Sequence, residues 1–114
     1  MKVAIVGSRA YPRLDKVREY VWSLPIDTTI VSGGARGVDI TAADAAHYRK
    51  MPVIVFLPDW DTHGKSAGFR RNKQIVDEAD MVVAFWDGKS KGTVHSINLA
   101  KKAGKECVVF GVEP

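Results

Sequence analysis

The residues with the clearest chemical potential form a glycine-rich turn, Ser32-Gly33-Gly34-Ala35-Arg36-Gly37, between an apolar run and an alanine-rich stretch. Its three glycines free the backbone to take positive φ and to approach a ligand closely. A turn that opens a helix presents unpaired N–H groups at the positive end of the helix dipole, where anions bind. Arg36 adds a guanidinium that can fork onto phosphate oxygens. The pattern predicts a phosphate site; a tight connection with glycines kept for geometry alone is the alternative.

Three further segments could complete such a site. The turn Gly7-Ser8-Arg9 follows an apolar strand, and a second glycine-containing turn runs from Trp86 to Thr93. The third segment is Arg70-Arg71-Asn72-Lys73, at the start of a predicted helix. Positive charge at a helix N-terminus is unfavourable unless an anion is nearby. We therefore expect phosphate contacts from Arg9, Arg36, Arg71 and Lys91, with a solvated basic face as the alternative.

The expected ligand-binding set combines these turns and this helix start. Its members are Gly7, Ser8, Arg9, Ser32, Gly33, Gly34, Ala35, Arg36, Gly37, Asp39, Arg71, Asn72, Trp86, Gly88, Ser90, Lys91, Gly92 and Thr93. Trp86 either stacks on a base or plugs the edge of the core. Asp39 either contacts ribose or stabilises its own helix. If the protein is an enzyme, Asp39 and Asp87 are the candidate catalytic carboxylates.

Two similar motifs do not account for the turns. Gly64-Lys65-Ser66 and Gly88-Lys89-Ser90 end like P-loops but lack the earlier glycine that wraps a triphosphate. The turn at Ser32 matches the dinucleotide fingerprint at its second and third glycines, but its first position is serine and it follows the second strand. No His, Cys or carboxylate pair has metal-ligand spacing. We therefore expect no metal and no cofactor.

Composition limits the class of protein. The 114 residues predict one domain, 1–114, and a net charge of +4 does not by itself indicate nucleic-acid binding. One cysteine, Cys107, excludes an internal disulfide and fits a reducing cytosol; we expect it to be a small buried hydrophobe. The apolar run Val3 to Val6 is too short for a signal peptide or a membrane span. The expected location is the cytoplasm.

The elements that must position these turns alternate along the chain. Predicted strands cover 2–6, 29–31, 53–57, 81–85 and 107–112, all buried, and predicted helices follow Pro12, Val38, Phe69 and Thr93. Pro12 suits the first turn of its helix, Thr93 can cap the last helix and Gly104 can end it. Residues 58–67 are expected to be irregular. This pattern predicts a three-layer Rossmann-like α/β sandwich with a five-stranded parallel sheet in the order 3-2-1-4-5. Ligands bind such sheets where the strand order reverses, which brings the three turns together.

Taken in order, these motifs resemble a known superfamily. The GSR turn at Gly7, the SGGARGVD element from Ser32 to Asp39, the RNKQI run at Arg71 and the SKGT turn at Ser90 look like the SLOG superfamily. That group contains the DNA-processing (Smf/DprA) proteins and the LOG phosphoribohydrolases, and the compact size resembles its small YspA-type branch. The resemblance implies a nucleotide, a nucleotide derivative or single-stranded DNA as ligand.

Three functions stay open at this point. The first is binding of a nucleotide or a phosphorylated nucleoside, with sensing of a nucleotide signal as its role. The second is single-stranded DNA binding, with Trp60, Phe69 and Trp86 as stacking residues beside Arg70 and Arg71. The third is LOG-like hydrolysis of a nucleoside monophosphate, although His95 and Ser96 stand where that family has its catalytic glutamate. A homodimer is also a possible assembly.

Overall fold

Five parallel strands in the order β3-β2-β1-β4-β5 form the centre of the computed structural model, which describes residues 1–112. The expected domain extends over residues 113–114, which lie outside the described part. The strands are β1 (Lys2–Gly7), β2 (Thr29–Ser32), β3 (Val53–Val55), β4 (Met81–Phe85) and β5 (Glu106–Phe110). The helices are α1 (Leu14–Ser23), α2 (Val38–Tyr48), α3 (Trp60–His63), α4 (Ala67–Glu78) and α5 (Lys91–Lys102). The predicted α/β fold and strand order are confirmed.

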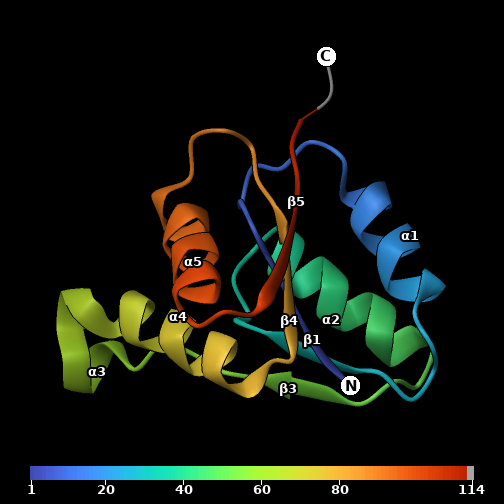
Figure 1. Ribbon diagram of the computed structural model, residues 1–114, viewed down its shortest axis with the longest axis horizontal. Coiled ribbons are helices and arrows are strands. Elements are labelled where there is room, and N and C mark those ends of the chain that lie inside the picture. The colour runs from blue at the N-terminus through green and yellow to red at the C-terminus, as the bar shows by residue number, and fades with distance from the viewer. Residues whose placement is uncertain (113–114) are drawn as a thin grey trace.

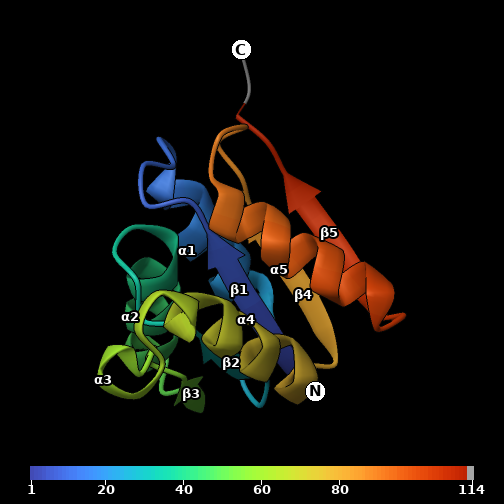
Figure 2. The ribbon, with the colours of Figure 1, turned by 90° about the vertical axis from the view of Figure 1, so that its left-hand side faces the viewer.

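Helices cover both faces of the sheet, with α1 and α2 on one face and α4 and α5 on the other (Figures 1 and 2). Side chains of β1 alternate between these layers. Val3 and Ile5 pack against α1 and α2, whereas Ala4 and Val6 pack against α4 and α5. Because both faces of this strand are covered, the sequence of β1 is continuously apolar instead of alternating.

The two edge strands differ from the prediction, since neither is fully buried. β3 ends at Val55, which is exposed, and β5 ends at Phe110, also exposed. Each edge strand has a neighbour on one side only, and the helices centre on the inner strands. Cys107 on β5 is accordingly half-buried, contrary to the expected full burial.

Three local predictions are also corrected. The segment 58–67 is not irregular: it contains α3 and a short 3₁₀ turn (Gly64–Ser66), and Asp59 caps α3 by accepting a hydrogen bond from the Thr62 N–H at 3.1 Å. Pro12 precedes α1, which begins at Leu14. α5 is capped by Ser90 and not by Thr93.

The predicted end of α5 is confirmed. Gly104 follows its last turn with φ of 69°, and its N–H donates to the Lys101 C=O at 3.1 Å. A positive φ just after a helix favours glycine. Across residues 1–112, no helix combines the length and the apolar character that a membrane crossing requires.

Candidate functional site

A cleft of about 450 Å³ opens at the carboxyl edge of the sheet, where the strand order reverses between β1 and β4. The loops after these two strands meet at the top of Figure 1, beside the start of α5. The cleft is lined by Val6, Gly7, Arg9, Ala10, Ala35, Asp39, Arg71, Asn72, Ile75, Asp87, Lys89, Ser90, Gly92, Thr93 and Ser96. Ends of strands, starts of helices and the middle of α4 therefore surround one hollow.

The turn from β4 to α5 forms one wall and is held by its own side chains. Asp87 Oδ1 accepts hydrogen bonds from the Lys89 and Ser90 N–H groups, both at 2.9 Å. These bonds lower the pKa of the Asp87 carboxyl. Trp86 Nε1 donates to the Ser90 C=O at 3.2 Å, so the indole braces the turn. The turn is thus organised without a ligand.

The first turn of α5, of which Gly92 and Thr93 line the cleft, contains open backbone donors. Ser90 Oγ accepts the Thr93 N–H at 3.3 Å and the Thr93 hydroxyl at 3.0 Å. Within residues 1–112, the N–H groups of Lys91 and Gly92 have no hydrogen-bond acceptor. The space in front of Gly92 is open for at least 4 Å where a Cβ would stand. Two free amides at the positive end of a helix dipole form a seat for an anion.

The glycine-rich turn before α2 differs in one respect, because one of its amides, that of Ala35, donates to a carboxylate of the same chain; within residues 1–112 the N–H groups of residues 36–39 have no acceptor. Asp39 is 5% exposed, and its Oδ2 accepts the Ala35 N–H at 3.4 Å. Burial raises the pKa of Asp39 to about 6, while the Arg71 charge and hydrogen bonds from the Ala35, Gly7 and Gly33 backbones act in the opposite direction. The position predicted for a phosphate is therefore partly occupied by an internal anion.

Arg71 forms the wall between these two regions. Its Nη1 donates to the Gly33 C=O and its Nε donates to Asn72 Oδ1 at 3.1 Å. Burial lowers the pKa of Arg71, as does the nearby charge of Arg9, while Asp39 raises it. A Cβ on Gly33 would lie 2.7 Å from both Arg71 Nη1 and Asp39 Oδ2. Glycine is thus the residue that lets this guanidinium approach the buried carboxylate.

Asn72 joins α4 to the start of α5. Its Nδ2 lies 3.2 Å from His95 Nδ1 and 3.4 Å from the Gly92 C=O. The His95 ring in turn meets the ring of Phe69 edge-on, with centroids 4.6 Å apart. Phe69 is 53% exposed and leaves an accessible aromatic surface beside the cleft.

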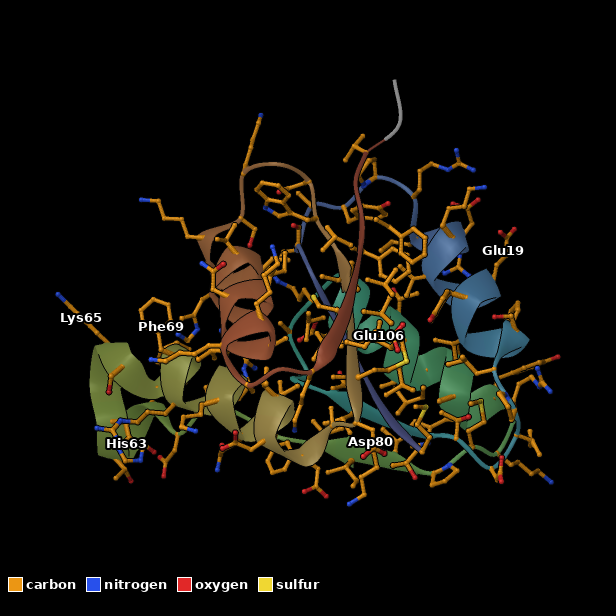
Figure 3. All side chains as sticks on the ribbon, viewed as in Figure 1. Glu19, His63, Lys65, Phe69, Asp80 and Glu106 are labelled. Carbon is orange, nitrogen blue, oxygen red and sulfur yellow. The ribbon has the colours of Figure 1, made fainter. Side chains whose placement is uncertain are left out.

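A second groove of about 420 Å³ adjoins the cleft and runs along α4. It shares Arg71 with the cleft and is also lined by the basic residues His63, Arg70 and Lys73 and by the carboxylates of Asp59 and Asp77, the latter paired with Lys73. Phe69 and His63 lie on the side where α3 projects, and Lys65 extends outward there (Figure 3). Basic and aromatic side chains therefore follow a path from the end of β1 towards α3.

The predicted site residues divide into three groups. Gly7, Arg9, Ala35, Asp39, Arg71, Asn72, Asp87, Ser90, Gly92 and Thr93 line the cleft. Ser8 and Ser32 are buried, and Ser8 Oγ accepts the Asp87 N–H at 3.1 Å, which ties β1 to β4. Outside the lining lie Gly33, Gly34, Arg36, Gly37, Trp86, Gly88 and Lys91. Ligand contact by any of these residues stays a prediction.

Five lining residues were missed from the sequence. They are Val6, Ala10, Ile75, Lys89 and Ser96. Lys89 had a readable signal, since it stands between Gly88 and Ser90 in a turn already selected for its glycines. Ser96 also had a signal, since it stands near the position of the LOG family's glutamate. Val6 and Ile75 are apolar residues inside regular elements and Ala10 is a small residue of the turn after β1, and nothing in their sequence context marks them as cleft residues.

Comparison with known proteins gives two sequence relationships. Residues 1–63 match the family model described as "YspA, cpYpsA-related SLOG family". The chain is also 36% identical over 127 aligned residues to the Gene 61 protein of Mycobacterium phage D29, covering 99% of this chain and 98% of that protein.

Two solved structures share the fold. DNA processing protein A from Helicobacter pylori, studied for its single-stranded DNA binding mode, superposes with a TM-score of 0.76 at 26% identity, over 99% of this chain and 66% of that chain. DNA processing protein A (DprA) from Streptococcus pneumoniae superposes with a TM-score of 0.83 at 23% identity, over 99% of this chain and 50% of that chain. The chain therefore spans only about two thirds and one half of these proteins. The family match over residues 1–63, with the phage relative over almost the whole length, establishes that this chain belongs to the YspA, cpYpsA-related SLOG family.

Proposed function

We propose that the protein binds single-stranded DNA at the carboxyl edge of its sheet. The observation that carries this proposal is the unpaired amide of Gly92, a residue that lines the cleft together with Arg9, Arg71 and Lys89; the neighbouring Lys91 amide is also unpaired within residues 1–112. A phosphate of the strand binds these amides, and the basic side chains neutralise it.

The groove along α4 favours single-stranded DNA over an isolated anion as the ligand. Arg70 continues the positive charge beyond the cleft, whereas Lys73 is paired with Asp77 at 2.9 Å, and exposed Phe69 offers a face on which a base can stack. Aromatic platforms beside a basic groove are the usual means of binding single strands without sequence readout. The H. pylori relative, studied for its binding of single-stranded DNA, has the same fold and adds support from outside this chain.

The test is fluorescence anisotropy with a labelled oligothymidine at two salt concentrations. Because phosphate contacts release counterions, the affinity should fall steeply with salt. Lys89→Ala should weaken binding several-fold at low salt and reduce the slope of log K against log salt by about 1. Arg9→Ala should behave in the same way.

Matched controls remove the same charge elsewhere. Lys102 lies in the last turn of α5 and Arg18 on α1, and neither lines the cleft. Lys102→Ala and Arg18→Ala should leave both affinity and salt slope close to wild type. Equal losses in cleft and control variants would mean that the net charge, and not the cleft, attracts the strand.

A second candidate is a free nucleotide or phosphorylated nucleoside. The size of the cleft, about 450 Å³, favours it because this volume suits a single small ligand. Competition separates the two candidates. If a strand is the ligand, a mononucleotide should displace the labelled oligonucleotide only at a large excess. If a nucleotide is the ligand, it should stabilise the protein thermally at concentrations where the oligonucleotide has no effect.

A further inference from the structure

The outer edge of β5 carries unsatisfied backbone groups. β5 pairs only with β4, so its other edge has no neighbour within residues 1–112. The Trp86 N–H donates to the Phe110 C=O at 2.9 Å, which shows that Phe110 bonds inward. Since alternate residues of a strand bond to opposite sides, the N–H and C=O groups of Cys107 and Val109 point outward. Charged side chains or a covering helix or loop usually protect such an edge from pairing with another strand. On β5, however, the apolar residue Val109 is 42% exposed.

A groove of about 910 Å³, lined by aromatic and aliphatic residues together with charged side chains of the α1 segment, lies beside this edge, between α1 and β5. Its floor is aromatic: Phe110 stacks on Phe85 with centroids 5.1 Å apart and meets Tyr20 at 5.6 Å. Phe110 and Val112 remain 38% and 45% exposed. β5 lies at the opposite side of the sheet from β3, and α5 packs against one of its faces (Figure 2).

Opposite charges mark the two ends of the strand. The Tyr11 hydroxyl donates to the Gly111 C=O at 2.8 Å, which places the segment before α1 at the end of β5. Arg13, Lys16 and Glu19 line the groove, and Arg13 is paired with Asp15 at 2.8 Å, which makes Lys16 the main cation of the groove. Glu106 stands at the start of β5, on the same face as Phe110, and its charge contributes to a raised pKa of Tyr20, for which burial is the larger cause.

We propose that the β5 edge pairs with the β5 edge of a second copy of this chain. Two identical edges related by a two-fold axis run antiparallel. The backbone N–H and C=O groups of Cys107 in each copy then bond to those of Val109 in the other copy. The two-fold axis therefore passes at Val108. In this register Glu106 of each copy reaches the end of the groove where Lys16 and Arg13 lie. The positions of the charges favour a second copy over an uncharged apolar partner.

Sedimentation velocity over a wide concentration series tests the proposal with the full chain. The wild type should show a concentration-dependent monomer–dimer equilibrium. Val109→Pro removes an outward N–H that the chain itself does not use, and proline is tolerated at such edge positions. This variant should be a monomer at all concentrations, whereas the matched control Val109→Ala keeps the N–H and should still dimerise. Circular dichroism establishes whether the proline variant is folded.

Charge exchange provides a second measurement that does not depend on proline. Glu106→Lys should weaken the dimer at least ten-fold, and adding Lys16→Glu should restore part of the loss, because the two charges exchange places across the axis. A wild type that stays monomeric at the highest concentration would overturn the proposal. A dimer that survives both Val109→Pro and Glu106→Lys would also overturn it, since another surface would then be responsible.

Discussion

At the level of single residues, the unexpected feature of the site is the position of Asp39. The glycine-rich turn has the geometry of an anion seat, but the chain supplies its own anion there. Asp39 accepts the Ala35 N–H, and Arg71 balances its charge across Gly33. The start of α5 differs in having no carboxylate folded onto its free amides at Lys91 and Gly92, and this is where we propose that a phosphate binds.

The raised pKa of Asp39 predicts how stability depends on pH. Burial raises the pKa of its carboxyl in the folded chain to about 6, from the usual 3.8. The folded state therefore holds its proton more tightly than the unfolded state does, and this group lowers stability as pH rises from about 4 to above 6. A shift of about two units corresponds to about 3 kcal/mol. Asp39→Asn should remove this contribution and be more stable than wild type at neutral pH.

Urea denaturation at acidic and neutral pH measures this contribution. The difference in unfolding free energy between Asp39→Asn and wild type should grow with pH, because other carboxyls, such as Asp87 with its lowered pKa, titrate equally in both proteins. A difference that does not change with pH would show that Asp39 has an ordinary pKa. A variant less stable at every pH would show that its hydrogen bonds to the turn outweigh the cost of burying its charge.

At the level of elements, the glycines of the site fill two different roles. Gly37 begins α2 with φ of 81°, and a Cβ there would stand 2.4 Å from the Arg9 C=O. It holds the β1–α1 loop against the start of α2. Gly92 lies in the first turn of α5 with open space around it and no positive φ. Only the first of these glycines is required by the fold.

This contrast predicts opposite effects of the same substitution. Gly37→Ala should destabilise the protein by about 2 to 4 kcal/mol, because both the backbone conformation and the contact with Arg9 become strained. Gly92→Ala should be neutral or stabilise by up to about 1 kcal/mol, since alanine favours the helix. Thermal denaturation of the two variants measures the difference. Equal effects would show that the turn before α2 can relax.

The sequence predicts the arrangement of elements well because burial and turns leave strong local signals. Continuous apolar strands and the order of the glycine turns are enough to predict a parallel sheet with its reversal between β1 and β4. The prediction that the edge strands are buried was wrong. Their burial depends on which neighbours lie over β3 and β5, and a strand's own residues do not contain that information. The missed α3 had a local signal, the cap formed by Asp59 with Thr62.

The candidate site is less predictable than the fold for a related reason. The residue types of the turns identify the correct edge of the sheet, and most lining residues follow from them. The side-chain positions decide which of these groups remain available to a ligand. Asp39 folds back onto its own turn, and Trp86 donates to the Ser90 C=O. These choices depend on contacts between segments far apart in the chain, so a local pattern cannot reveal which amides stay free.

At the level of the whole molecule, the clefts and the proposed dimer edge lie on different sides of the sheet. The cleft opens at the carboxyl ends of β1 and β4, whereas the dimer edge runs along β5. Antiparallel pairing of the two β5 strands turns the carboxyl ends of the two sheets in opposite directions. The two clefts of a dimer then face away from each other, and a short DNA strand cannot reach both.

This arrangement predicts that dimerisation does not alter the affinity of the protein for short single-stranded DNA. Val109→Pro should bind a short oligothymidine with the same affinity as wild type, and calorimetry should give one strand per chain without cooperativity. If the clefts instead faced the same side, a strand long enough to reach both would bind the dimer more tightly than the monomer through effective concentration. A ten-fold weaker affinity of Val109→Pro for a short strand, with its fold intact, would contradict opposed clefts. A length series extends the test, because the advantage of the dimer should emerge only when a strand can pass around the edge of the joined sheet.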